Sequence, residues 1–161
     1  MLKRALGVGL LILLTLSGCG KERKGKDTVY DVVVRTIDGK VIRLSDYEGK
    51  VIIVDFWATW CKPCRKSIPD FNRLQREFGD SLLILGISKD DSPEDVRAFM
   101  REIPIEYPVA MSSKKLEERF GGILGLPTAF LIDRKGRIVK KFLGYKPYRV
   151  WKENVEALLS R

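Results

Sequence analysis

The chain of 161 residues contains no histidine and only three cysteines. The absence of histidine excludes a cysteine–histidine nucleophile pair, a serine–histidine–aspartate triad and any metal site with a histidine ligand. The sequence also lacks internal repeats and low-complexity tracts. Its basic residues are not interleaved with aromatic residues in any recognisable pattern, and we therefore expect no nucleic-acid partner.

Negative charge is in the minority, with 21 acidic against 30 basic residues and a formal net charge of +9. The basic residues are scattered, apart from a modest cluster between residues 21 and 26. This pattern is typical of a solvated basic surface, with binding to an anionic membrane surface as the alternative. The length is sufficient for one domain with a sizeable core.

No apolar run is long enough to span a bilayer comfortably, but a shorter one is present at the N-terminus. Lys3 and Arg4 precede an apolar run over residues 8–16, which has the length of the hydrophobic region of a signal peptide. The sequence Leu16-Ser17-Gly18-Cys19 follows and resembles a bacterial lipobox. We predict a lipoprotein signal peptide over residues 1–18 and lipidation of Cys19. A plain cleaved signal peptide and an uncleaved anchor are the alternatives.

Residues 19–28 begin at the predicted lipidation site, are rich in charge and contain no large apolar residue. They predict a flexible, lipid-anchored tether. The folded domain, expected over residues 29–161, then lies outside the cytoplasmic membrane. Lipidation would consume Cys19 and leave Cys61 and Cys64 as the only thiols.

A strand followed by a Cys-x-x-Cys pair organises the rest of the chain. Residues 51–54 are four consecutive β-branched residues, which predict a buried strand. The pair Cys61-Lys62-Pro63-Cys64 stands where a helix is expected to start. Around this centre the patterns predict an order of ββ-βα-βα-(β)α-ββα. Further strands are expected over 29–36, 41–44, 82–87, 107–111 and 137–143, and another is expected to start at Pro127. The helix that starts at the cysteine pair is expected to end at 78, and further helices are expected over 92–103, 112–120 and 147–160.

Three local signals refine these elements. Asp38-Gly39 predicts the turn of an N-terminal hairpin. Ser45 and Glu48 fit a capping box at the start of a short helical turn. Ser92 followed by Pro93 predicts an N-cap and a first helical position.

The two thiols of Cys61 and Cys64 would lie on one face of a helical first turn, close enough to form a disulfide. The first lies near unpaired N–H groups and the positive end of the helix dipole, which favours its thiolate form. The second lies deeper and is better shielded. We therefore expect Cys61 to attack a partner disulfide and Cys64 to resolve the mixed disulfide. Half of a zinc site is the alternative, but no histidine or second cysteine pair is present to complete it.

The stretch from Trp57 to Cys64, Trp-Ala-Thr-Trp-Cys-Lys-Pro-Cys, resembles the active site of the thioredoxin superfamily. More narrowly, it resembles the membrane-anchored thiol–disulfide oxidoreductases of the TlpA/ResA group, whose extra N-terminal element is also found in peroxiredoxins. The resemblance covers residues 29–161. It implies an α/β fold, a thioredoxin-like three-layer α/β/α sandwich with an extra N-terminal β-hairpin. It implies no cofactor, and the lack of histidine argues against the copper-delivering relatives of thioredoxin.

The resemblance assigns roles to further residues. Asp55 corresponds to the acid that is proposed in thioredoxin to take the proton of the resolving thiol, and burial would raise its pKa. A water-exposed aspartate at the strand end is the alternative. Many TlpA/ResA proteins instead carry a glutamate three residues after the second cysteine, where this chain has Ser67.

Pro127 resembles the cis-proline of the loop that packs against the disulfide and presents backbone groups to an extended substrate. Trp57 is expected in the core. Trp60 is a candidate either for substrate contact or for packing.

The function implied is that of an exported, membrane-anchored oxidoreductase that reduces protein disulfides. Its implied partners are apocytochrome c or other exported disulfide-containing proteins, and a transmembrane thiol electron donor. A disulfide-donating oxidase or isomerase uses the same chemistry in the opposite direction. A peroxiredoxin-like peroxidase is a further alternative, although its Pro-x-x-x-Thr-x-x-Cys motif is missing. A thioredoxin-fold chaperone or binding module is the non-enzymatic alternative.

Overall fold

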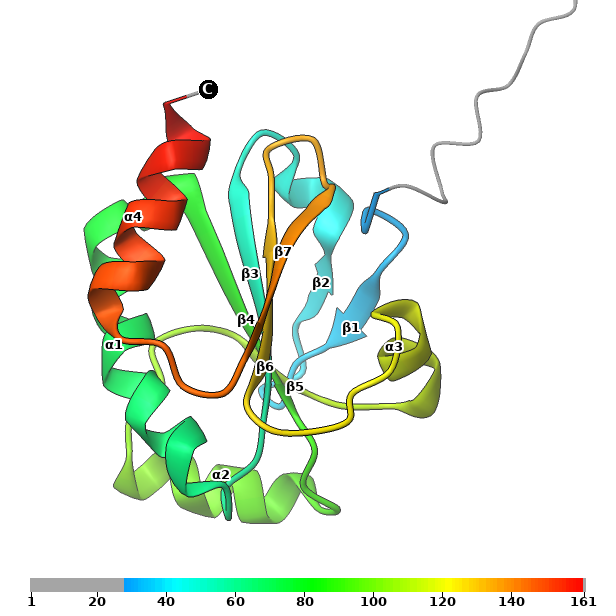
Figure 1. Cartoon of the computed structure of the whole chain (residues 1–161). Coiled ribbons are helices and arrows are strands. Elements are labelled where there is room, and N and C mark those ends of the chain that lie inside the picture. The colour runs from blue at the N-terminus through cyan, green and yellow to red at the C-terminus, as the bar shows by residue number, and fades with distance from the viewer. Residues whose placement is uncertain (1–27, 161) are drawn as a thin grey trace, which may run out of the picture.

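The computed structural model describes residues 28–160 (Figure 1). The predicted signal peptide, Cys19 and the tether up to residue 27 lie outside these residues. Within residues 28–160, no helix combines the length and the apolar character needed to cross a membrane.

A five-stranded mixed sheet forms the middle layer, in the order β5-β4-β3-β6-β7. The strands β3, β4 and β5 are parallel to one another, whereas β6 is antiparallel to β3, and β7 is antiparallel to β6. The central position of β3 explains its run of β-branched residues, because both of its faces are covered. The strand bounds are β3 Val51–Trp57, β4 Leu82–Ser88, β5 Val109–Met111, β6 Thr128–Ile132 and β7 Ile138–Leu143.

Helices cover both faces of this sheet and complete the predicted three layers (Figure 1). One hydrophobic cluster joins the sheet to α1, α2 and α4, and a second joins the opposite face to the N-terminal hairpin and α3. The helix bounds are α1 Lys62–Phe78, α2 Pro93–Glu102, α3 Lys114–Arg119 and α4 Tyr148–Leu159. The structure therefore confirms the predicted element order.

The N-terminal hairpin is present as a separate two-stranded sheet of β1 (Val33–Arg35) and β2 (Val41–Arg43). The first strand is shorter than predicted, because residues 29–32 form a turn, in which the Val32 N–H donates to the Val29 carbonyl at 3.0 Å. The Val29 N–H donates to the Gly136 carbonyl at 2.8 Å, in the turn between β6 and β7. The 3-10 turn η1 (Leu44–Tyr47) follows, but the predicted capping box is wrong. Arg43 occupies the N-cap position, and no side chain caps the turn.

The alternation of side chains along β3 places its residues on two different faces. Val51, Ile53 and Trp57 belong to the cluster beneath α1 and α4, whereas Ile52, Val54 and Phe56 belong to the opposite one. Asp55 lies on the same side of β3 as Ile53 and Trp57, so its side chain belongs to the face that α1 covers.

Candidate active site

The two cysteines lie at the start of α1 and form a disulfide, with their Cα atoms 5.3 Å apart. Cys61 is the N-cap residue of the helix, and its Sγ accepts a hydrogen bond from the Cys64 backbone N–H at 3.3 Å. Cys61 is 6% exposed and Cys64 is 1% exposed. Cys61 is thus the more accessible sulfur and the closer one to the unpaired N–H groups of the helix end, as the sequence predicts.

The loop before Cys61 is held by Asp90, a residue that the sequence analysis missed. The Asp90 carboxylate accepts from the Thr59 backbone N–H at 3.0 Å and from the Thr59 hydroxyl at 2.6 Å. It also accepts from the Ser88 hydroxyl at 2.7 Å. Asp90 follows β4 closely, and the carboxyl ends of the parallel strands β3 and β4 meet at this edge of the sheet.

The same loop is held from the helix side by Arg65. Its Nε donates to the Thr59 carbonyl at 2.7 Å, and its guanidinium lies 5.2 Å from the centroid of the Phe99 ring. The backbone N–H, the hydroxyl and the carbonyl of Thr59 are therefore all hydrogen-bonded, which fixes the backbone two residues before Cys61.

Asp55 lies within the core at 2% exposure, so the water-exposed alternative is wrong. Desolvation raises the pKa of its carboxyl group to about 7, as the sequence predicts. Its Oδ1 has no hydrogen-bond partner among the described residues. A buried carboxyl group with a pKa near neutrality suits both acceptance and release of a proton.

Pro127 precedes β6, and its peptide bond with Leu126 is cis. The residues before it form one wall of a groove that reaches Cys61. Trp60 is 68% exposed and Leu124 is fully exposed, whereas Trp57 is buried as predicted. The exposure of Trp60 favours substrate contact over packing. The groove is lined by Trp60, Cys61, Pro63, Lys89, Ile123, Leu124, Gly125 and Leu126.

Ser67 is buried on α1, one turn after Cys64, at 3% exposure. It adds no ionisable group to the site, which leaves Asp55 as the acid on this face of β3. Within residues 28–160, no group of three or more cysteine, aspartate or glutamate side chains is arranged to hold a metal ion.

Comparison with known proteins places this geometry in a family. A profile described as the AhpC/TSA family matches residues 26–141. The thiol–disulfide oxidoreductase ResA of Bacillus cereus (strain ATCC 10987 / NRS 248) is 32% identical, over 100% of this chain and 98% of that protein. The chain belongs to the AhpC/TSA family of thioredoxin-like proteins.

Solved structures agree with this assignment. A putative thiol:disulfide interchange protein DsbE from Chlorobium tepidum is 33% identical, with a TM-score of 0.74 over 83% of this chain and 96% of that one. The exposed lipoprotein thioredoxin of Streptococcus pneumoniae strain TIGR4 is 30% identical, with a TM-score of 0.72 over 80% and 99%. This AhpC/TSA member is a thiol–disulfide oxidoreductase of the ResA/DsbE type, with Cys61 and Cys64 as its disulfide-forming pair.

Proposed function

We propose that the protein is an exported, lipid-anchored reductase of protein disulfides. The observation that carries the proposal is the Cys61–Cys64 pair at the N-terminus of α1, open to an apolar groove beside the Pro127 loop. A groove with exposed Trp60 and Leu124 at its surface suits an extended polypeptide better than a small polar molecule.

The reaction begins with the reduced pair. The Cys61 thiolate attacks one sulfur of the substrate disulfide, and the other substrate sulfur leaves as a thiolate that takes a proton from water. Cys64 then gives its proton to Asp55 and attacks the Cys61 sulfur. The second substrate sulfur leaves as a thiolate and is protonated in turn. Two electrons pass to the substrate, and the enzyme ends as the Cys61–Cys64 disulfide.

Return to the reduced state needs an electron supply outside the cytoplasm. We assign that role to a transmembrane thiol donor. Apocytochrome c and other exported disulfide-containing proteins are the proposed substrates, on the basis of the resemblance to the TlpA/ResA group.

The anchor is proposed from the lipobox-like residues 16–19, and the lipoprotein named among the similar structures supports it. Mass spectrometry of the N-terminal peptide from membrane-extracted protein tests this. The proposal expects a peptide that begins at Cys19 and carries a diacylglyceryl group. An unmodified Cys19, or a chain that retains residues 1–18, contradicts it.

The catalytic roles are tested by trapping the mixed disulfide. In Cys64→Ser the resolving thiol is missing, so a disulfide-bonded substrate is expected to remain attached to Cys61 on a non-reducing gel. Cys61→Ser serves as the matched control and is expected to trap nothing. Attachment through Cys64, or full activity of Cys61→Ser, would contradict the proposal, and the second result would favour a chaperone or binding module.

A further inference from the structure

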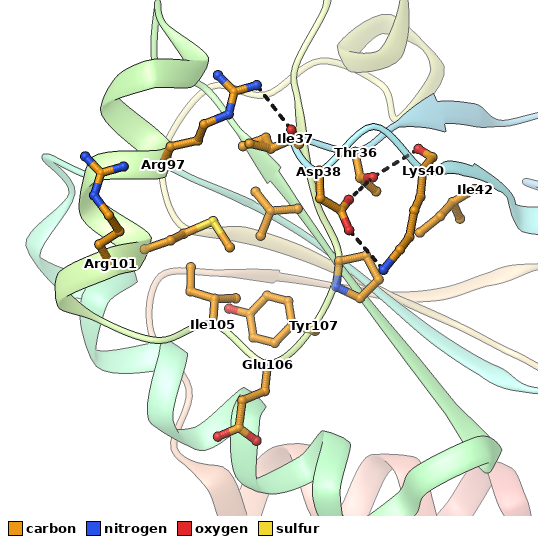
Figure 2. A pocket seen from close by; sticks show the side chains of 13 residues that line it. Thr36, Ile37, Asp38, Lys40, Ile42, Arg97, Arg101, Ile105, Glu106 and Tyr107 are labelled. Carbon is orange, nitrogen blue, oxygen red and sulfur yellow. Dashed lines mark hydrogen bonds and ion pairs between the residues drawn. The ribbon is translucent and has the colours of Figure 1, made fainter.

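A second groove lies on a different side of the molecule, between the hairpin turn, α2 and the segment before β5 (Figure 2). Tyr107 lines this groove although its side chain is only 4% exposed. In Figure 2 its ring lies beside Ile105 at the base of the groove. Tyr107 belongs to the same hydrophobic cluster as the redox pair and packs edge-on against Phe71 of α1, with ring centroids 6.0 Å apart.

Gly86 explains why Tyr107 approaches the active-site strand. Gly86 is the neighbour of Asp55 in the register of β3 and β4. A Cβ atom at Gly86 would lie 3.1 Å from the Tyr107 ring and 3.1 Å from Nε1 of Trp57. Because Gly86 has no side chain, the Tyr107 ring and the Trp57 indole can both pack against the position beside Asp55. Each of these aromatic groups carries a hydrogen-bond donor.

The polar atoms at this place are not satisfied. Asp55 Oδ1 and Trp57 Nε1 are both buried without a hydrogen-bond partner among the described residues. Burial of a polar group without a partner is costly, and the cost is greater once a carboxyl group becomes charged. Ionised Asp55 thus needs donors, and the Tyr107 ring, which carries a hydroxyl, and the Trp57 indole N–H are both adjacent to Gly86.

The charged groups around Tyr107 do not compete for this role. On the groove side, three charged side chains are already in ion pairs: Lys40 with Asp38, Arg97 with Glu94, and Glu106 with Arg76. Arg101 lies exposed at the rim. Burial first, and then the charge of Asp55, raise the pKa of the Tyr107 hydroxyl well above its ordinary value. The hydroxyl therefore stays protonated at neutral pH and remains a donor.

We propose that Tyr107 is a positioning residue of the redox reaction, whose hydroxyl donates a hydrogen bond to the Asp55 carboxylate when Asp55 is ionised. The inference rests on the proposed role of Asp55 as proton acceptor for Cys64. A donor to the charged form favours that form, so more of the enzyme carries a usable base at neutral pH. The Trp57 indole is the second donor available to the same carboxylate.

Tyr107→Phe removes the hydroxyl alone and tests the proposal on the full chain in detergent. Release of a preformed mixed disulfide is followed by stopped flow between pH 5.5 and 9. In the wild type we expect the release rate to rise with a midpoint near the Asp55 pKa of about 7. Loss of a donor to a charged group moves such a midpoint by about one pH unit. The midpoint of Tyr107→Phe is therefore expected at higher pH, with several-fold slower release at pH 6.5.

The matched control is Tyr47→Phe, which removes a hydroxyl from η1 on the opposite core cluster. This control, and the rate of the first attack by Cys61 in both variants, are expected to match the wild type. An unchanged or lower midpoint in Tyr107→Phe overturns the inference. A wild type that never forms the mixed disulfide overturns the proposed function instead.

A measurement without any change at Tyr107 covers the case in which that variant fails to fold. The ¹³Cζ resonance of Tyr107 is followed by NMR against pH in the wild type and in Asp55→Asn. The inference expects a shift with the midpoint of Asp55 in the wild type and none in Asp55→Asn. A resonance that does not respond to pH in the wild type contradicts it.

Discussion

Ionisation of the buried Asp55 carboxyl group lowers the stability of the folded protein, whereas the proposed reaction uses the ionised form as a base. Its folded-state pKa of about 7 lies well above the value near 4 of an unfolded chain, because burial disfavours the charge. Between these two pH values the folded state binds more protons than the unfolded state. Folding stability due to Asp55 is therefore fully present below about pH 4 and is lost as pH rises through 7.

Asp55→Asn removes this ionisation while it keeps the size of the side chain. We expect the variant to be more stable than the wild type at pH 8, by at most about 4 kcal/mol, and nearly equal to it at pH 4. Urea unfolding of the oxidised protein at both pH values measures the difference. Equal stability of the two proteins at pH 8 would show that Asp55 is not desolvated as described.

Asp90 holds the loop before Cys61 through its hydrogen bonds to Thr59 and not through the sulfurs themselves. Asp90→Ala removes three acceptor contacts, including both bonds to Thr59. We expect the loop that carries Trp60 to loosen, so that KM for a protein disulfide rises several-fold while the rate with a small disulfide changes little. Asp91→Ala is the control, because Asp91 is exposed and makes no hydrogen bond or ion pair among the described residues. Equal KM values for the two variants would argue against the positioning role.

The residues of the site differ in whether their positions can be predicted from the sequence immediately around them. Cys61, Cys64 and Asp55 follow from one stretch of sequence, because strand alternation and the helix start fix their relative positions. Asp90 and Tyr107 come from other segments of the chain, and only the fold brings Asp90 to Thr59 and the Tyr107 ring to Gly86, the neighbour of Asp55 on β4. Nothing in the local pattern around them marks that contact.

At the scale of elements, the turn between β6 and β7 holds the start of the domain. Gly136 has a φ of +77°, and a Cβ atom there would lie 2.7 Å from the Tyr30 ring. The Tyr30 hydroxyl donates to the Arg134 carbonyl at 3.0 Å, next to the bond between Val29 and Gly136. This packing explains why Val29 and Tyr30 lie outside the hairpin.

Gly136→Ala tests that packing, with Gly39→Ala as its control. Both glycines have a positive φ, so both substitutions carry a backbone cost of about 1–2 kcal/mol. Nothing lies within 4 Å of a Cβ atom at Gly39, whereas Gly136→Ala must also displace Tyr30. We expect Gly136→Ala to cost about 1–3 kcal/mol more in urea unfolding. Equal costs would mean that Tyr30 is not held by this turn.

The elements themselves were predictable where periodicity and caps agree. Ser92 accepts from the Glu94 N–H as a side-chain N-cap of α2, and Gly79 ends α1. The errors lie at the N-terminal elements. There, residues 29–32 have the composition of a strand but form a turn whose first residue, Val29, bonds to the distant Gly136. Ser45 fits a capping pattern, but Arg43 holds the N-cap position.

At the scale of the whole molecule, the redox pair and the start of the domain lie at opposite ends (Figure 1). Val29 is bonded beside the turn from β6 to β7, whereas Cys61 follows the far end of β3. The 17-residue helix α1 starts at the redox pair and spans about 25 Å. We infer that the proposed anchor, joined to the domain before residue 28, would leave the catalytic end facing away from the point of attachment and open to separate partners.

We propose that electrons flow from this protein to substrate disulfides. The reduction potential of the Cys61–Cys64 pair, equilibrated in defined thiol buffers, tests it most directly. Thioredoxin-like proteins range from about −270 mV for a reductant to about −120 mV for a strong oxidant. We predict a value near or below the reducing end of this range. A value near the oxidising end would contradict the account and make disulfide donation the function of the pair.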